Sequence, residues 1–219
     1  MRRTTLLFSL LASSVLYSQA SAQTCVGMPS FASGNMQVAG GGTFTDGANA
    51  FGGTFGYGAP KGLYGKAGVG TTSYDGLGGS SFDFGLAGGY TIPLETKRTA
   101  EVCPMASLSI GSGPNNVAGS GNDLSSRTFA FGASLGALVN KSSVVQILPN
   151  AAFQFANTRS TIDDGTTSIS GSESYGLLTL GTGFVFHSRF SVNPSISIPV
   201  GLSGSSSSFG LGGAINFGR

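Results

Sequence analysis

Charged side chains are scarce in this chain of 219 residues, making up only 9% of it, against about 25% in a typical soluble domain. So little charge leaves few side chains to solubilise an ordinary polar surface. It also excludes the clustered lysines and arginines with which proteins bind nucleic acid. Disorder is disfavoured as well, because hydrophobic residues make up 40% of the chain and disordered chains lack that apolar content. The apolar side chains must therefore be accommodated in a folded structure.

Long apolar runs are also missing from most of the chain. One short run, Leu6–Leu16, follows Arg2 and Arg3 and precedes the small-residue pattern Ala20–Ala22. This order is typical of a secretory signal peptide, and the run is too short to span a bilayer comfortably as a retained anchor. We expect residues 1–22 to be removed on export. After position 22 no apolar run is long enough for a transmembrane helix.

Apolar residues instead recur at every second position, which is the period of a β-strand. The clearest cases are Phe190–Leu202, where they alternate with serine and asparagine, and Phe209–Phe217. We predict ten strands, most of them longer than the strands of soluble sheets and suited to a tilted membrane crossing. The predicted strands cover 36–45, 50–59, 62–73, 81–92, 101–111, 127–139, 144–156, 174–186, 190–202 and 209–217.

Three prolines fall inside these predicted strands, at Pro149, Pro194 and Pro199. Proline removes a donor from the hydrogen-bond ladder of a sheet. We therefore expect local bulges at these positions, or strand limits that differ from the predicted ones.

The links between the predicted strands differ on the two sides of the sheet. Longer links alternate with short turns, and the long-link side carries six acidic and two basic residues, against two acidic and six basic on the short-turn side. Long outer loops and short periplasmic turns are typical of outer-membrane barrels, and an even strand number puts both termini in the periplasm. The longer links are Asp46–Asn49, Tyr74–Ser80, Gly113–Ser126, Asn157–Glu173 and Ser203–Ser208, and the short turns are Pro60–Lys61, Leu94–Ala100, Asn140–Ser142 and His187–Arg189.

A sheet that crosses a membrane has to close, because each unpaired backbone group costs several kcal/mol in hydrocarbon. A soluble barrel would turn its apolar face inward and a charged face outward, and this chain has almost no charge for such a face. The predicted fold class is therefore all-β, a closed antiparallel up-and-down transmembrane β-barrel of ten strands, with eight strands as the alternative. It occupies residues 36–219, after a periplasmic N-terminal segment at 23–35.

In this architecture the chain resembles the small outer-membrane β-barrel proteins of bacteria, the OmpA-like class of eight to ten strands. The most specific part is the last strand, where Gly212, Ile215 and Phe217 resemble the family's C-terminal assembly signal, although Gly218 and Arg219 follow the final aromatic. An ordinary amphipathic strand is the alternative. The resemblance implies the bacterial outer membrane as the location, with outer-membrane lipids and the barrel-assembly machinery as partners.

Cysteine occurs only at Cys25 and Cys103, and export would place both in an oxidising compartment. Cys25 lies near the start of the exported chain and Cys103 near the start of the fifth predicted strand, so both fall on the predicted periplasmic side. We expect a disulfide between them, which would contribute roughly 4 kcal/mol by closing a loop of nearly eighty residues. Two free thiols are the alternative.

Residue types that carry catalysis or bind metals are few. His187, the only histidine, falls in a short turn, so no Ser-His-acid or Cys-His site can be assembled around it. Asp163, Asp164 and Gly165 lack the spacing of a calcium loop and are typical of a turn. We expect no catalytic residue, no metal and no cofactor.

Three charged residues fall on the inward face of the predicted barrel, Lys66, Asp83 and Glu101. They could be mutual partners that avoid uncompensated buried charge, or they could tune a narrow aqueous pathway. Many other inward residues are glycine, alanine or serine and would leave room for a hollow. We expect a non-enzymatic outer-membrane protein with a structural or surface-interaction role; the alternative is a narrow pore, or a binder or transporter of a small hydrophobic molecule.

Overall fold

The computed structural model describes residues 36–59, 62–75, 79–94, 100–115, 123–141, 144–163, 165–187, 190–202 and 204–217. The predicted signal peptide at 1–22, the predicted segment at 23–35 and Cys25 lie outside the described residues. Among the described residues, no helix has the length and apolar character needed to cross a membrane.

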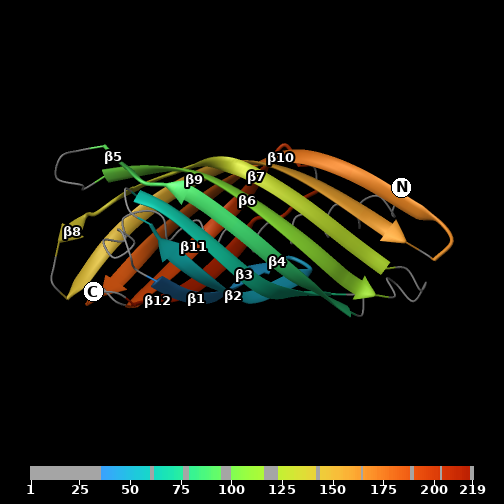
Figure 1. The fold of residues 1–219 in the computed structure, drawn as a ribbon, viewed down its shortest axis with the longest axis horizontal. Helices are drawn as coiled ribbons and strands as arrows, with labels where there is room; N and C mark the ends of the chain where they lie inside the picture. Colours follow the sequence, from blue (N-terminus) through green and yellow to red (C-terminus); the bar gives the residue numbers. More distant parts are fainter. Residues whose placement is uncertain are drawn as a thin grey trace.

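Ten long antiparallel strands form a closed barrel (Figure 1). Each pairs with its neighbours in chain order, and β1 pairs with β12 to complete the ring. Two strands of two residues, β5 (Ile92–Pro93) and β8 (Asn140–Lys141), add to the sheet beside β6 and β9. The long strands are β1 (Met36–Thr45), β2 (Ala48–Gly58), β3 (Leu63–Tyr74), β4 (Gly79–Tyr90), β6 (Ala100–Asn115), β7 (Asp123–Ala137), β9 (Val145–Asp163), β10 (Ser168–Phe186), β11 (Phe190–Val200) and β12 (Ser208–Phe217).

The barrel has two ends that differ in shape. The hairpin end carries the turns β1–β2, β3–β4, β6–β7, β9–β10 and β11–β12, and the terminal end carries Met36 and Phe217. At the hairpin end β9 and β10 continue past β11 and β12, so that Ser168–Tyr175 pair with β9 although the ladder between β10 and β11 begins only at Gly176. Figure 1 shows this extension beyond the ends of β11 and β12.

The ten predicted strands all exist, which confirms ten rather than eight, but two predicted links were wrong. The segment Asn157–Glu173, predicted as a loop, is mostly strand, and only residues 164–167 separate β9 from β10. The link Gly113–Ser126 is likewise shortened to residues 116–122. Serine and threonine occupy both faces of these extensions, so they carry no apolar alternation that would have marked them as strands.

The three prolines lie inside continuous strands, and the register stays constant at Pro194 and Pro199, whereas at Pro149 the partner of β9 changes from β7 to β8 with a shift of one residue. Pro149 lies one residue past the last pair between β7 and β9. Pro194 lies in a gap of the β10–β11 ladder, and Pro199 lies beyond the last pair between β11 and β12. Each proline thus lies where one of the two neighbouring ladders is interrupted, while the pairing on its other side continues without a shift of register.

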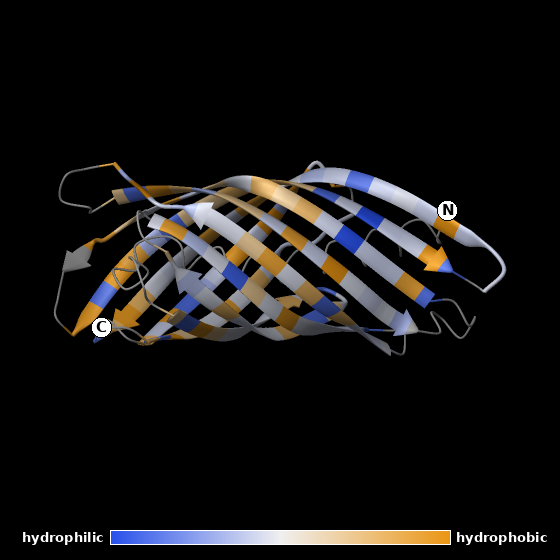
Figure 2. Ribbon diagram, in the orientation of Figure 1, coloured by the Kyte–Doolittle hydropathy of each residue, from blue (hydrophilic) through white to orange (hydrophobic). Residues whose placement is uncertain are grey.

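Alternation sorts the side chains into an apolar outside and a polar inside. Thr72, Thr158 and Ser191 are fully buried, whereas Phe55 keeps 52% of its surface exposed. Figure 2 shows apolar and polar residues alternating along the strands. This is the predicted direction, with the apolar face outward. The exposed large side chains that form this apolar belt include Val38, Phe51, Phe55, Val69, Phe84, Leu86, Leu108, Ile110, Phe129, Phe131, Leu135, Phe153, Phe155, Leu180, Ile196, Ile198, Leu211 and Ile215.

Candidate functional site

One cluster of polar side chains spans the seam where the barrel closes. Lys66 on β3 is buried, and its Nζ donates to Oε1 of Gln37 on β1 at 3.4 Å. Gln37 in turn donates from Nε2 to Oδ1 of Asn216 on β12 at 2.7 Å. These hydrogen bonds join the first and last strands through their side chains, in addition to the backbone ladder.

A second cluster surrounds Asp83 on β4, which is 2% exposed. Its Oδ2 accepts hydrogen bonds from the hydroxyls of Thr72 and Ser81, each at 3.4 Å. The Ser81 hydroxyl also lies 3.2 Å from the Tyr74 hydroxyl. Hydroxyl donors are suited to a buried carboxylate, since they compensate part of the hydration that it loses.

The three predicted lumen charges occupy separate parts of the inner wall. Lys66 lies opposite Ala87, whereas Asp83 lies opposite Gly70, four positions further along β3. Glu101 is half-buried on β6. The hydrogen bonds described place Lys66 and Asp83 in different clusters, and the mutual pairing of the three charges stays a prediction.

Cys103 on β6 is fully buried near the terminal end. It packs with Tyr64, Leu148 and Val185. Its Sγ lies 3.7 Å from the Thr91 hydroxyl oxygen. Because Cys25 lies outside the described residues, the predicted Cys25–Cys103 pairing stays a prediction.

The three residues of the predicted assembly signal lie on β12, the strand that closes the ring. Ile215 and Phe217 point outward and are 47% and 53% exposed. Gly212 pairs with Gly41, and a Cβ built on it would meet only backbone oxygens at 3.8 and 3.9 Å. Packing space therefore does not require glycine at position 212.

The residues considered for metal or catalytic chemistry lie in turns. His187 is exposed, has a positive φ of 49°, and donates its backbone N–H to the Val144 carbonyl at 3.2 Å. Asp163 accepts the backbone N–H of Gly165 at 2.8 Å, which is the geometry of an Asx turn. In the described ranges no three His, Cys, Asp or Glu residues gather as a metal site would require.

Sequence reasoning missed a pair of arginines, because it assigned Arg159 to a loop and Arg127 to the first residue of a strand. Both lie within extended strands, Arg127 on β7 and Arg159 on β9, directly opposite one another. Both are exposed on the outward face. The signal was present in the sequence, since Arg127 has the same parity as Phe129, and Arg159 the same parity as Phe155.

No family model matches this chain, and no curated protein matches it. Solved structures do match. The translocator domain of the autotransporter NalP from Neisseria meningitidis aligns with a TM-score of 0.54 at 10% identity, covering 97% of this chain and 98% of that one. The β-domain of the Bordetella autotransporter BrkA aligns with a TM-score of 0.50 at 12% identity, covering 85% and 100%.

A third similar structure, the N-terminal β-barrel domain of Pseudomonas aeruginosa OprF, has 14% identity and a TM-score of 0.40, with 84% of this chain and 98% of that one covered. Identities this low concern the fold alone. The two autotransporter domains, together with the closed ring of ten strands, show that this chain has the fold of the small outer-membrane β-barrel proteins.

Proposed function

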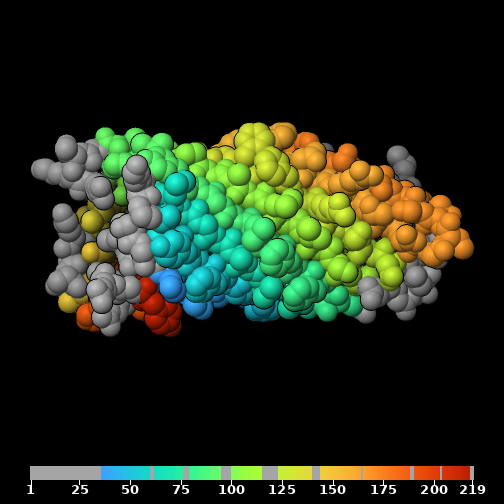
Figure 3. All heavy atoms as spheres, in the orientation of Figure 1, coloured from blue at the N-terminus to red at the C-terminus, as the bar shows by residue number. Residues whose placement is uncertain are grey.

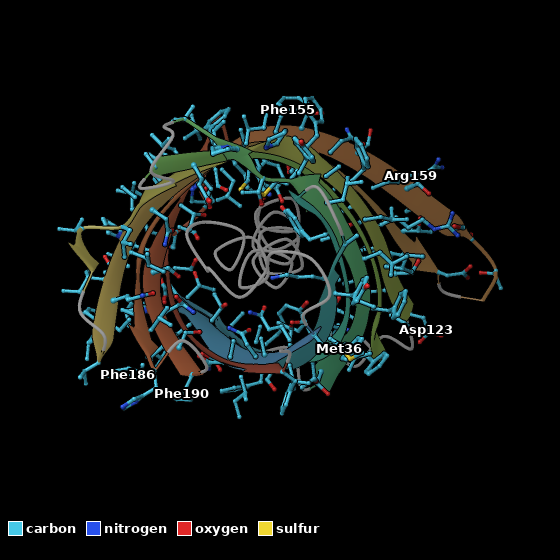
Figure 4. The ribbon with its side chains drawn as sticks, turned by 60° about the vertical axis from the view of Figure 1, so that its left-hand side comes forward. Met36, Asp123, Phe155, Arg159, Phe186 and Phe190 are labelled. Atoms are coloured by element: carbon cyan, nitrogen blue, oxygen red, sulfur yellow. The ribbon has the colours of Figure 1, made fainter. Side chains whose placement is uncertain are left out.

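We propose that this protein is a non-enzymatic component of the bacterial outer membrane, with a structural or surface-interaction role. The observation that supports this most is the apolar belt on the outside of a closed ring (Figure 4). Soluble monomers rarely expose contiguous apolar patches larger than a few hundred Å². A belt around the whole barrel matches the hydrocarbon of a bilayer, in which closure leaves no backbone group unpaired.

The proposal includes an orientation, with the hairpin end outside the cell and the terminal end in the periplasm. The extension of β9 and β10 at the hairpin end supports it, since outer-membrane barrels project further on the external side. A cleaved signal peptide at 1–22, a periplasmic segment at 23–35 and a disulfide between Cys25 and Cys103 belong to the same proposal. Outer-membrane lipids and the barrel-assembly machinery are its expected partners.

Electrophoresis of the refolded protein tests the membrane assignment. The mature chain, refolded into detergent micelles, should migrate differently in unheated and boiled samples, because a closed barrel of ten strands resists detergent until heated. Refolding without detergent or lipid should give aggregates. A soluble monomer in plain buffer would contradict the proposal.

The same gel tests the assembly signal when it is applied to outer-membrane fractions of cells. Phe217→Ala should lower the fraction of heat-modifiable protein in cells while leaving refolding in detergent unchanged. Phe209→Ala is the matched control, since Phe209 lies on the same strand and also points outward, 48% exposed. Equal losses for the two variants would assign the effect to lost apolar contact and remove the signal role.

A second candidate function is a narrow pore, and the small side chains of one part of the inner wall favour it. Glycine, alanine and threonine of β1, β2 and β12 line this part together with Asn193. Such a wall suits a small polar solute better than a hydrophobic molecule. Purified protein in a planar bilayer should then show discrete single-channel openings, and a silent bilayer at every voltage would remove the pore and leave the structural role.

A further inference from the structure

The two outward arginines lie close enough to repel each other electrostatically. Arg127 and Arg159 are direct cross-strand partners on one face, which brings their Cβ atoms to about 5 Å from each other. Like charges in this position destabilise a sheet. The other cross-strand neighbours give no compensating charge, since Arg127 also faces Ile110 and Arg159 also faces Ser172.

The pair lies where the apolar belt ends. In one cross-strand row, Val69, Phe84 and Ile110 are followed by the two arginines. In the next row toward the terminal end, Leu108 and Phe129 are followed by Asn157 and Ser174. Figure 4 shows Phe155 and Arg159 outside the barrel wall. The arginines therefore lie at the level where hydrocarbon gives way to headgroups if the belt is in a bilayer.

Hydroxyl groups and a hollow accompany the arginines. Ser125, Ser126, Arg127, Arg159 and Thr161 line a hollow of about 300 Å³. Ser125 and Thr161 pair across the strands on the side away from the belt. Guanidinium groups only donate hydrogen bonds, and hydroxyls can donate one each. The hollow is therefore suited to an anion with several acceptor oxygens.

The charge of this end is otherwise acidic. Arg127 and Arg159 are the two basic residues that the sequence places at the hairpin end, beside six acidic ones. The nearest acids along the same strands, Asp123 and Asp163, pair with each other four residues further from the belt. Four strand residues separate the Cα atoms of these acids from those of the arginines by roughly 13 Å. Glu173 on β10 is nearer along the ladder, but it lies opposite the buried Thr158 on the inward face, so the two arginines form a local cationic site on the outward face of an acidic end.

An apolar groove of about 680 Å³ runs along the outside of the barrel, on the side of the arginines that faces the terminal end. Its floor includes Gly65 and Ala67, and its lining includes Leu86, Leu108 and Phe129. Phe129 is the next outward residue after Arg127 on β7, so the end of the groove at Phe129 lies two strand residues from Arg127, although neither arginine lines the groove. Figure 3 shows the face of the barrel that β3, β4, β6 and β7 form.

We propose that Arg127 and Arg159 bind the phosphate of an anionic lipid headgroup, with an acyl chain of the same lipid in the apolar groove. Paired guanidinium groups bind phosphate oxygens bidentately, which neutralises the repulsion between them. The inference rests on the proposed function, because a lipid reaches this site only if the belt lies in a bilayer. Given the proposed orientation, the lipid belongs to the outer leaflet.

Binding of a fluorescent phosphatidic acid to the refolded protein in neutral detergent micelles, followed by anisotropy, tests the site. The wild type should bind it about tenfold more tightly than phosphatidylcholine with the same chains, which corresponds to one charge-assisted contact. Arg127→Gln with Arg159→Gln should abolish this preference. Lys141→Gln with Arg189→Gln, which removes the same charge from the short-turn side that the sequence predicts, should leave it unchanged.

The arms of the experiment separate the possible failures. Equal binding by all variants would overturn the lipid site, and displacement of the probe by equimolar inorganic phosphate would assign the site to free phosphate instead. Arg127→Lys with Arg159→Lys keeps the charge and should retain only part of the preference. The wild type and each variant are also checked for the heat-dependent gel shift. A wild type that lacks this shift would contradict the proposed function. If all proteins show the shift and bind the lipid equally, only the lipid site is contradicted.

Discussion

Replacing Leu86 by arginine should lower the free energy of unfolding from lipid vesicles by about 2–4 kcal/mol, the cost of placing arginine on the lipid face near the bilayer midplane. Leu86 is 47% exposed on the outward face of β4. Phe82 and Tyr90, both also exposed, lie four residues to either side of it on the same face. Leu86 therefore lies near the middle of the apolar belt, and equilibrium unfolding in urea measures the change.

Two control variants separate the effect of depth in the bilayer from the effect of losing the leucine side chain. Ser112 is an exposed outward residue on β6, two positions beyond Ile110 toward the hairpin end. Ser112→Arg should cost only about 0–1 kcal/mol, because arginine near an interface reaches water. Leu86→Ala removes apolar volume without adding charge and should cost less than Leu86→Arg. Equal costs for the two arginine variants would mean that the outward face does not lie in hydrocarbon.

The strands of the barrel wall could be predicted because successive residues of a strand face two different environments, one apolar and one polar. Apolar side chains such as Phe84 and Leu86 face outward, and polar ones such as Asp83 face inward, so apolar and polar residues alternate along the sequence of a strand. The hairpin extension lacks this contrast. From Ser168 to Ser174 both faces meet water, and only the backbone ladder to β9 reveals a strand. Arg159 was assigned to a loop for the same reason, because the part of β9 that contains it pairs with this part of β10.

The contacts between inward side chains could not be predicted, because the alternation along a strand gives the face of each side chain but not its partner on another strand. Gln37 and Asn216 are 179 positions apart and touch because β12 closes on β1 in one particular register. Parity predicted that Lys66 and Asp83 face inward, but only the register shows which hydroxyl or amide each one meets. The prolines also depend on register, since each lies where a neighbouring ladder ends or is interrupted, and these positions follow from how the strands are staggered.

Removing the proposed disulfide should cost roughly 4 kcal/mol of stability, the chain-entropy value for a closed loop of nearly eighty residues. Cys103→Ala also removes a buried sulfur packed against Tyr64 and Leu148, so its own loss includes a packing contribution. Cys25→Ser leaves that packing in place and is therefore the cleaner variant. Unfolding by urea in micelles, with and without reductant, measures both.

A double-mutant comparison distinguishes a shared bond from two separate thiols. If Cys25 and Cys103 form one bond, the double variant should be no less stable than Cys103→Ala alone, because the first substitution already breaks the bond. Reductant should destabilise the wild type once it unfolds and leave all variants unaffected. Independent thiols would give additive losses and two titratable groups in the denatured, unreduced chain. Since Cys103 is fully buried, the folded wild type should also resist reduction, so the bond is expected to break only after the barrel opens.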